Sequence, residues 1–279
     1  MTKLNTADTQ HSTPIVLTIA GSDSGGGAGI QADIKAISAT GSYACSAITA
    51  ITAQNTLTVS AIHPITLEHV EKQLDAVFND LNIIAVKVGM LADTDIINVV
   101  AKKLKQYQPA FLVVDPVMVT RNGDLLLEKS AIDTLKKQLL PMADLITPNL
   151  LEGAALIDYQ QPIDEQAMQS MVSGLRQLGA KAVLLKGGYL QENQNSNDLL
   201  ILQNSTQQLL AKRIPTNNTH GTGCTLSSAI ASYLAQGYEL TQSVQLGKDY
   251  ITQALTYANQ LSIGQGHGPV HHFYKQTNR

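Results

Sequence analysis

The sequence predicts an α/β fold with a largely parallel central sheet. Segments with the apolar, β-branched composition of buried strands alternate along the chain with segments that repeat apolar residues at helical spacing. This alternation is typical of βαβ units, which build parallel sheets. With 44% hydrophobic and 15% charged residues, the chain also has enough apolar material for a sizeable core.

The first two thirds of the chain contain most of the expected strands and helices. We expect strands at residues 15–20, 43–53, 84–88, 111–114 and 145–146, and helices at residues 29–40, 67–81 and 96–104. The helix at residues 67–81 has its apolar residues on one face, and the strand at residues 43–53 is rich in Ile and Thr.

The last third begins with an amphipathic helix at residues 168–178 and a strand at residues 182–185. Residues 188–215 then change in pattern, and a polar stretch beside short apolar runs favours an antiparallel hairpin at the sheet edge. Two helices close the chain, from about Gly221 and from Leu240. Because no repeat or linker interrupts the pattern, we expect one domain over residues 14–279, preceded by a loose tail at residues 1–13.

Charge and composition exclude several classes of protein. A formal net charge of -3 gives no electrostatic argument for binding nucleic acid, which usually requires a basic face. No apolar run approaches the roughly 20 residues of a membrane span, and the polar first residues do not form a signal peptide. The only two cysteines, Cys45 and Cys224, lack metal-ligand spacing, so a reducing cytoplasm is the simplest inference.

Polar and glycine residues recur where the expected strands end. The carboxyl ends of parallel strands share one edge of the sheet, where α/β proteins bind ligands. We therefore expect a small-molecule site at this edge. The residues at these strand ends are Gly21, Gln54, Gly89, Asp115, Asn149, Gly187 and Gly221.

The first glycine-rich loop, residues 21–29, joins a strand to a helix but fits neither phosphate-binding template. A Walker loop needs Gly-Lys-Ser/Thr where Ile30 follows Gly29, and the G-x-G-x-x-G fingerprint started at Gly25 also fails at Ile30. Dinucleotide binding is therefore disfavoured, and a tight turn for close helix packing is the structural alternative. Asp33, one turn into the helix, is either a solvated acid at the helix start or a ligand anchor.

The second glycine-rich loop, residues 217–225, opens directly into an amphipathic helix. Consecutive N–H groups at Gly221, Thr222, Gly223 and Cys224 would form an anion-binding nest that can stabilise a transferring phosphoryl group. A helix N-terminus lowers a thiol pKa, so we expect Cys224 to favour the thiolate. The alternative is a buried and inert cysteine.

Acidic and basic residues lie between these loops. Asp115 ends one strand, Asn149 and Glu152 open a helix after the next, and Lys186 ends another. Dispersed oxygen ligands suit Mg²⁺, and Lys186 could place an ammonium near phosphates. Alternatively, Glu152 is a first-turn helix acid and Lys186 a surface residue. The C-terminal His267, His271 and His272 lack a metal-ligand pattern, so we interpret them as packing or surface residues.

Together these motifs closely resemble the hydroxymethylpyrimidine/phosphomethylpyrimidine kinases of thiamine biosynthesis, a branch of the ribokinase-like superfamily. The resemblance runs over residues 14–274. Its landmarks are IAGSDSGGGAGIQAD at 19–33, TAQNT at 52–56, KVGML at 87–91, DPVM at 115–118, TPNLLE at 147–152, NTHGTGCT at 218–225 and GHGPVHHF at 266–273.

The resemblance implies a three-layer αβα ribokinase-like domain that pairs as a homodimer and uses ATP with Mg²⁺. It implies a pyrimidine pocket formed by Gly21, Asp33, Gln54, Met90 and Val117. It places Asn149 and Lys186 at the nucleotide, Asp115 and Glu152 at the metal, and Gly221, Thr222, Gly223 and Cys224 in a catalytic anion hole.

The implied activity is phosphorylation of 4-amino-5-hydroxymethyl-2-methylpyrimidine and then of its monophosphate. Ribokinase-like sugar kinases have an aspartate base where this chain, like this branch, has Cys224. We expect Cys224 to assist the first transfer and, as a neutral thiol, to tolerate the charged second acceptor. The rival interpretations are a pyridoxal or pyridoxine kinase, a non-catalytic small-molecule sensor on the same scaffold, and a dehydrogenase.

Overall fold

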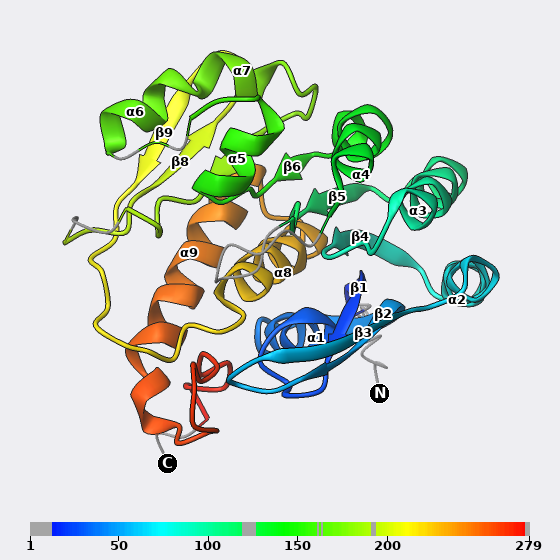
Figure 1. Ribbon diagram of the computed structural model, residues 1–279, viewed down its shortest axis with the longest axis horizontal. Coiled ribbons are helices and arrows are strands. Elements are labelled where there is room, and N and C mark those ends of the chain that lie inside the picture. Colours follow the sequence, from blue (N-terminus) through cyan, green and yellow to red (C-terminus); the bar gives the residue numbers. More distant parts are fainter. Residues whose placement is uncertain (1–12, 119–126, 161, 163, 191–193, 277–279) are drawn as a thin grey trace, which may run out of the picture.

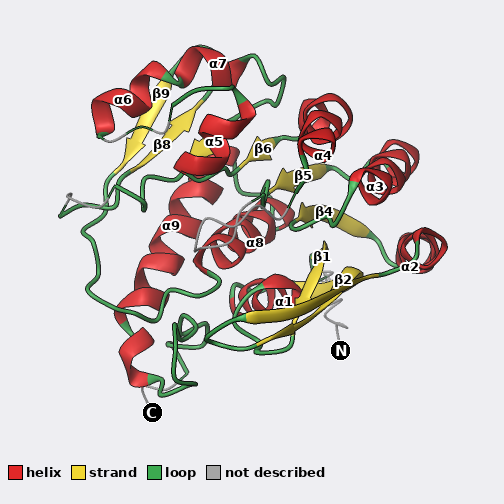
Figure 2. Cartoon of the chain, in the orientation of Figure 1, coloured by secondary structure: helices red, strands yellow, loops and turns green. Residues whose placement is uncertain are grey.

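The computed structural model describes residues 13–118, 127–160, 162, 164–190 and 194–276. Within these residues a nine-stranded sheet has the order β3-β2-β1-β4-β5-β6-β7-β8-β9 (Figures 1 and 2). The parallel strands are β1 (Ile15–Asp23), β2 (Tyr43–Gln54), β4 (Ile83–Val88), β5 (Phe111–Val114), β6 (Leu145–Ile146) and β7 (Val183–Leu185). The antiparallel strands are β3 (Val59–Pro64) at one edge, and β8 (Asp198–Ile201) followed by β9 (Thr206–Leu209) at the other. The predicted fold class is confirmed.

Helices cover both faces of the sheet and make three layers (Figure 1). One face carries α1 (Gly29–Ala39), α8 (Thr222–Ala235) and α9 (Leu240–Thr256). The other carries α2 (Leu67–Asp80), α3 (Thr94–Tyr107), α4 (Lys129–Thr134), α5 (Leu150–Leu156), α6 (Glu165–Ser170) and α7 (Val172–Arg176). Strand β1 shows why both faces are apolar: Leu17 and Ile19 join the core under α2 and α3, whereas Val16 joins the core under α1 and α8.

Three expected elements differ from the structure. The helix predicted at residues 168–178 is two helices, α6 and α7, that meet at Met171. The hairpin at the sheet edge is confirmed, but its second strand is residues 206–209 and not residues 209–214. Strand β3 was not predicted; all six of its residues are exposed, so no buried face imposes an apolar alternation on it.

The expected tail falls almost wholly on residues 1–12, which lie outside the described residues. All nine strands, from residue 15 to residue 209, belong to one sheet. One domain over residues 14–279 stays a prediction. In the described part of the chain, no helix combines the length and apolar character needed to cross a membrane.

Candidate active site

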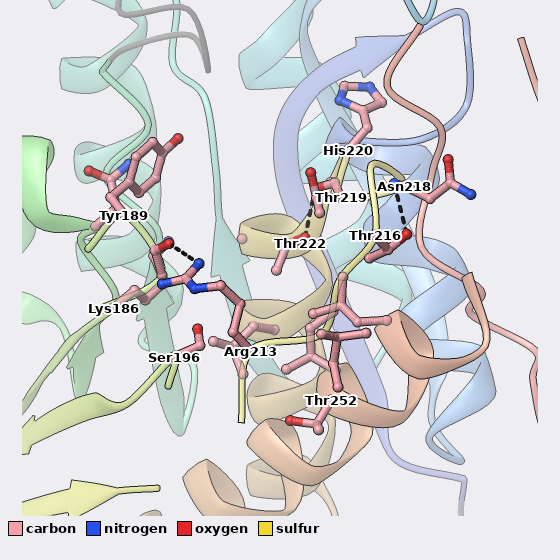
Figure 3. Close-up of a pocket in the computed structure, with 18 of the residues that line it drawn as sticks. Lys186, Tyr189, Ser196, Arg213, Thr216, Asn218, Thr219, His220, Thr222 and Thr252 are labelled. Atoms are coloured by element: carbon pink, nitrogen blue, oxygen red, sulfur yellow. Dashed lines mark hydrogen bonds between the residues drawn. The ribbon is translucent and has the colours of Figure 1, made fainter. Parts of the chain in front are cut away.

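Residues that follow three parallel strands meet at one cavity of about 1250 Å³. Asp115 follows β5, Asn149 and Glu152 open α5 after β6, and Lys186 follows β7. The other wall is the loop of residues 211–220, the start of α8 and one face of α9 (Figure 3). The predicted residues in the lining are Asp115, Val117, Asn149, Glu152, Lys186, Gly221, Thr222, Gly223 and Cys224.

Asp115 and Lys186 form a buried ion pair at the floor of this cavity. Lys186 Nζ donates to Asp115 Oδ1 at 2.8 Å, and the Thr147 hydroxyl donates to the same oxygen at 2.9 Å. A Cβ added to Gly223 would lie 3.1 Å from Lys186 Nζ and 3.4 Å from Asp115 Oδ2. The start of α8 therefore faces an ammonium and a carboxylate across a narrow space, into which a Cβ at position 223 would fit only tightly.

Asn149 and Glu152 cap α5 reciprocally. The Asn149 side chain accepts from Glu152 N–H at 2.9 Å, and Glu152 Oε2 accepts from Asn149 N–H at 2.7 Å. This capping box explains the spacing of the two residues without any ligand. Both nevertheless line the cavity, and Asn149 pairs with Lys186 in a short parallel bridge. The structural and functional interpretations of Glu152 are thus compatible.

The N-terminus of α8, at which an anion hole was predicted, lies against the first glycine-rich loop. Gly221 is the N-cap residue with φ +78°, and among the described residues no side chain caps this end. The first N–H groups of a helix lack intrahelical partners and carry the positive end of its dipole. A Cβ on Gly221 would overlap the carbonyl oxygen of Gly27, so the positive φ and the close backbone approach both require glycine.

Charges around the cavity shift one another's pKa values. Burial raises the pKa of Asp115, but Lys186 and Lys87 outweigh burial and lower it overall. Burial lowers the pKa of Lys186, but Asp115 and Glu152 raise it to about 12. Burial raises the pKa of Glu152 to about 7, with Asp115 adding to the rise and Lys186 opposing it. Glu152 is therefore the carboxylate that holds a proton most readily.

The expectation that Cys224 favours its thiolate is wrong. The thiol lies at the cavity floor, where burial raises its pKa to about 11, although Lys87 opposes the rise. Protein atoms around the sulfur exclude water more effectively than the helix start attracts negative charge. Cys224 is a neutral thiol at pH 7.

The acceptor half predicted by the resemblance lies beside the cavity. Gly21 contacts Met90 so closely that an added Cβ would stand 2.7 Å from Met90 Cε. Gln54 Nε2 lies 3.4 Å from Nε2 of His220, which lines the cavity. Gly21 and Gln54 belong to β1 and β2 rather than to the loops after them, because both strands run further than predicted. Gly221 follows no strand directly, since β9 ends at Leu209.

Asp33 is not brought to the cavity. It is fully buried, and Lys87 Nζ donates to both of its carboxylate oxygens at 2.8 Å. The hydroxyls of Thr18 and Ser228 donate to it at 2.6 Å and 2.7 Å. A carboxylate offers about four acceptor positions, and the four hydrogen bonds from these three groups occupy them. The geometry therefore gives Asp33 a role in holding β4, α1 and α8 together rather than a free oxygen for a ligand.

The sequence analysis missed three residues that organise the site. Lys87 is the only charged residue in the apolar strand β4. Because a buried charge requires a partner, this lysine could have indicated a buried ion pair. Asp23 and His220 form a pair across the two glycine-rich loops, at 2.8 Å. The C-terminal histidines do not line the cavity; His271 and His272 are buried, and the ring of His272 bonds with the Thr225 hydroxyl.

Comparison with known proteins identifies relatives over most of the chain. The family model of phosphomethylpyrimidine kinase matches residues 23–271. The Escherichia coli hydroxymethylpyrimidine/phosphomethylpyrimidine kinase is 48% identical over 258 residues, 92% of this chain and 97% of the relative. A thiamine biosynthesis bifunctional protein of Geobacter sulfurreducens is also 48% identical, and the match covers 92% of this chain and 52% of that protein.

Solved structures agree on the fold. The phosphomethylpyrimidine kinase of Clostridium difficile superposes with a TM-score of 0.76 at 45% identity, over 86% of this chain and 99% of that one. The ADP complex of Bacillus subtilis pyridoxal kinase superposes with a TM-score of 0.88 at 34% identity, over 96% of this chain and 100% of that one. The chain belongs to the phosphomethylpyrimidine kinase family.

Proposed function

We propose that this protein transfers phosphate from ATP to 4-amino-5-hydroxymethyl-2-methylpyrimidine and then to the resulting monophosphate. One observation carries the proposal: the uncapped start of α8 faces the Asp115–Lys186 pair across the space at Gly223, inside a cavity that Cys224 also lines. Phosphoryl transfer depends on positioning and on charge stabilisation more than on covalent chemistry of the protein. Helix N–H groups and an ammonium that converge on one point supply both.

The residues at the cavity floor fit a magnesium ion. Among the described residues no group of three His, Cys, Asp or Glu side chains could hold a metal by itself. Mg²⁺ does not need one, because it keeps several waters and binds one or two carboxylates together with substrate phosphates. Asp115 and Glu152 would hold it, and Asp115 Oδ2 faces the space at Gly223. When bound, the ion would neutralise phosphate charge.

The protein's own groups divide the remaining work. Lys186, held by Asp115, presents a permanent positive charge, since its pKa is raised to about 12. Of the predicted anion hole, the N–H groups of Gly221, Gly223 and Cys224 would hold the phosphoryl oxygens as charge moves toward the leaving group. The N–H of Thr222 donates to the Thr219 carbonyl at 3.3 Å and would have to leave it to join them. The ADP complex of the Bacillus subtilis neighbour supports ATP as the donor.

Cys224 suits two acceptors of different charge. A neutral thiol does not repel an incoming phosphate, whereas a fixed carboxylate would. Because burial raises the pKa of Cys224 to about 11, the thiol is the favoured form near neutral pH, so Cys224 is a weak general base before substrates bind. Assistance to the alcohol transfer stays a prediction, which Cys224→Ala tests below.

The test of the proposed function is mass spectrometry of the products formed from ATP, Mg²⁺ and the hydroxymethylpyrimidine. We expect a monophosphate and then a diphosphate. The fold similarity to pyridoxal kinase favours pyridoxal as the second candidate acceptor, and a reaction that yields only pyridoxal phosphate would establish that alternative. ATP turnover with neither acceptor phosphorylated, or no turnover at all, would favour a sensor.

We also propose that the protein is a cytoplasmic homodimer. Strands β2 and β3 expose apolar side chains at the sheet edge, among them Ile51, Val59 and Ile62 with 50%, 37% and 44% exposure. An apolar exposed edge of this kind favours association with a second copy. Both cysteines are free thiols, which suits a reducing compartment. Light scattering coupled to size exclusion would measure the mass, and Ile51→Lys with Ile62→Lys should give monomers.

A further inference from the structure

Among the described residues, the side chains of Asp23 and His220 pair across the two glycine-rich loops, next to the close approach of Gly221 to the Gly27 carbonyl. We propose that His220 is a positioning residue: its ring N–H holds Asp23, and thereby fixes the loop of residues 23–28 on the acceptor side against the start of α8. This inference rests on the proposed function and deepens it. On this proposal, His220 sets the position of the acceptor alcohol relative to the phosphoryl group that is transferred.

Asp23 organises the first loop from the end of β1. Only 2% of Asp23 is exposed, and its Oδ1 accepts from Gly25 N–H at 2.8 Å. Its Oδ2 accepts from Gly27 N–H at 3.0 Å and from Ala28 N–H at 2.8 Å. The carboxylate thus gathers three amides of the turn. His220 Nε2 completes the set at 2.8 Å, from a position 197 residues later in the chain.

The distance between His220 and Asp23 settles which ring nitrogen carries a proton. A nitrogen 2.8 Å from a carboxylate oxygen must donate, because two lone pairs at that distance repel. His220 Nε2 is therefore protonated. Gln54 Nε2 lies 3.4 Å from the same nitrogen, and the two ends of an amide are assigned only through its hydrogen bonds. With the amide turned over, Gln54 would accept from that proton, so His220 reaches both the loop and Gln54.

Backbone contacts hold the His220 ring in place. A Cβ on Gly27 would overlap His220 Cδ2, and a Cβ on Gly221 would overlap the Gly27 carbonyl oxygen. From the other side, His220 N–H donates to the Gly268 carbonyl at 3.0 Å. The ring therefore packs against the first loop while the backbone of His220 is held by the C-terminal segment. Figure 3 shows the ring above Thr219 and Thr222, near the start of α8. The loops cannot separate without breaking this contact.

This arrangement matters because phosphoryl transfer requires the attacking oxygen about 3–3.5 Å from phosphorus and in line, and a misplacement of 1 Å can cost about 100-fold in rate. One loop lies beside the predicted pyrimidine contacts, and the other carries the N–H groups for the phosphoryl oxygens. His220 joins them next to Gly221. Loss of the ring should therefore reduce turnover and acceptor binding while it leaves ATP binding intact.

The experiment compares His220→Ala, His220→Gln and Gly27→Ala with the wild-type protein, and uses His69→Ala on the exposed side of α2 as a control. Glutamine places an N–H donor at about the reach of Nε2. We expect His220→Ala to lower kcat by about 10- to 100-fold and to raise the acceptor KM, with the ATP KM within about twofold. His220→Gln should recover most of the loss. Gly27→Ala should lower kcat in the wild type but add nothing in the His220→Ala background, where the clash is absent.

A second measurement does not depend on activity. In the ligand-free protein, hydrogen exchange at the Asp23-bound amides of Gly25, Gly27 and Ala28 should accelerate at least about tenfold in His220→Ala and stay near wild type in His220→Gln. The positioning role would be overturned by unchanged hydrogen exchange in His220→Ala. It would also be overturned if the kcat of His220→Gln were as low as that of His220→Ala. A wild-type protein that forms no phosphorylated pyrimidine would instead refute the proposed function, and the exchange data would still decide whether the link exists.

Discussion

The buried pair of Lys87 and Asp33 offers the sharpest test of how this site is supported. Lys87→Met removes the ammonium but keeps most of the side-chain volume. It leaves the Asp33 carboxylate fully buried with two hydroxyl donors and no counter-charge. We expect the variant to lose both stability and activity, because β4, α1 and α8 meet at this carboxylate.

The expected magnitude follows from burial. Both side chains of the pair are 0% exposed, and removal of one partner of a buried ion pair costs about 3–5 kcal/mol. The double variant Asp33→Asn/Lys87→Met removes both charges and should recover most of that loss, since the hydroxyls of Thr18 and Ser228 can still bond to an amide. As a control, Lys72→Met breaks a pair whose side chains are 69% and 76% exposed, and should cost less than about 1 kcal/mol.

The assay is urea unfolding followed by circular dichroism, with pyrimidine affinity measured by calorimetry on the folded variants. A Lys87→Met loss below about 1 kcal/mol would refute the argument from burial. The double variant also separates two roles of Asp33. Recovered stability with wild-type pyrimidine affinity means that the pair supports the fold and that neither charge is needed to bind the pyrimidine. Recovered stability with lost affinity means that a ligand reaches Asp33, as the family resemblance predicted.

Three further predictions concern the cavity itself. Because burial raises the pKa of Glu152 from 4.5 to about 7, the folded state binds a proton that the unfolded chain releases between these values. The Glu152 carboxyl should therefore stabilise the ligand-free fold less as pH rises from about 4.5 to about 7, whereas His272, whose pKa burial lowers from 6.5 to about 3, acts in the opposite direction. Glu152→Gln keeps the capping box and removes only the Glu152 contribution, so the melting temperature of the wild type relative to this variant should fall over that range, and the variant should have a raised Mg²⁺ requirement. Cys224→Ala should slow phosphorylation of the alcohol more than that of the monophosphate in single-turnover assays; equal slowing would leave only a role in the anion hole. Gly221→Ala should abolish turnover, because its Cβ would overlap the Gly27 carbonyl oxygen. The control is Gly237→Ala, at φ +89° with no neighbour within 4 Å; it should keep its activity and lower the melting temperature by a few degrees at most.

Much of the fold could be predicted because buried parallel strands and amphipathic helices leave strong local patterns. The strand at residues 111–114 was placed at its observed bounds, and the helix starting at Leu240 was placed correctly. Strand β3 escaped because none of its residues is buried. The break at Met171 escaped because α6 and α7 continue one apolar periodicity, which conceals the interruption.

The candidate site divides in the same way. The convergence of Asp115, Asn149 and Lys186 follows from strand ends that share one edge, and their places in the cavity lining agree with it. The two side-chain pairs that support the site could not be predicted from the sequence. Lys87 and Asp33 are 54 positions apart, and His220 and Asp23 are 197 positions apart, so neither pair leaves a periodic signal. The thiol pKa was misjudged for a related reason: a helix start is visible in sequence, whereas the protein atoms that surround a sulfur are not.

The charges around the start of α8 explain why Glu152 holds a proton so readily. Lys87 is matched by Asp33, and Lys186 is matched by Asp115, so each ammonium already has its carboxylate. Glu152 is then the surplus negative charge in a buried setting, and protonation is the means by which a ligand-free site removes it. A cation that arrives with nucleotide phosphates would replace that proton. Because Asp33 and Asp115 pair with the two lysines, we expect Glu152 to be the carboxyl that gives up its proton when a cation binds.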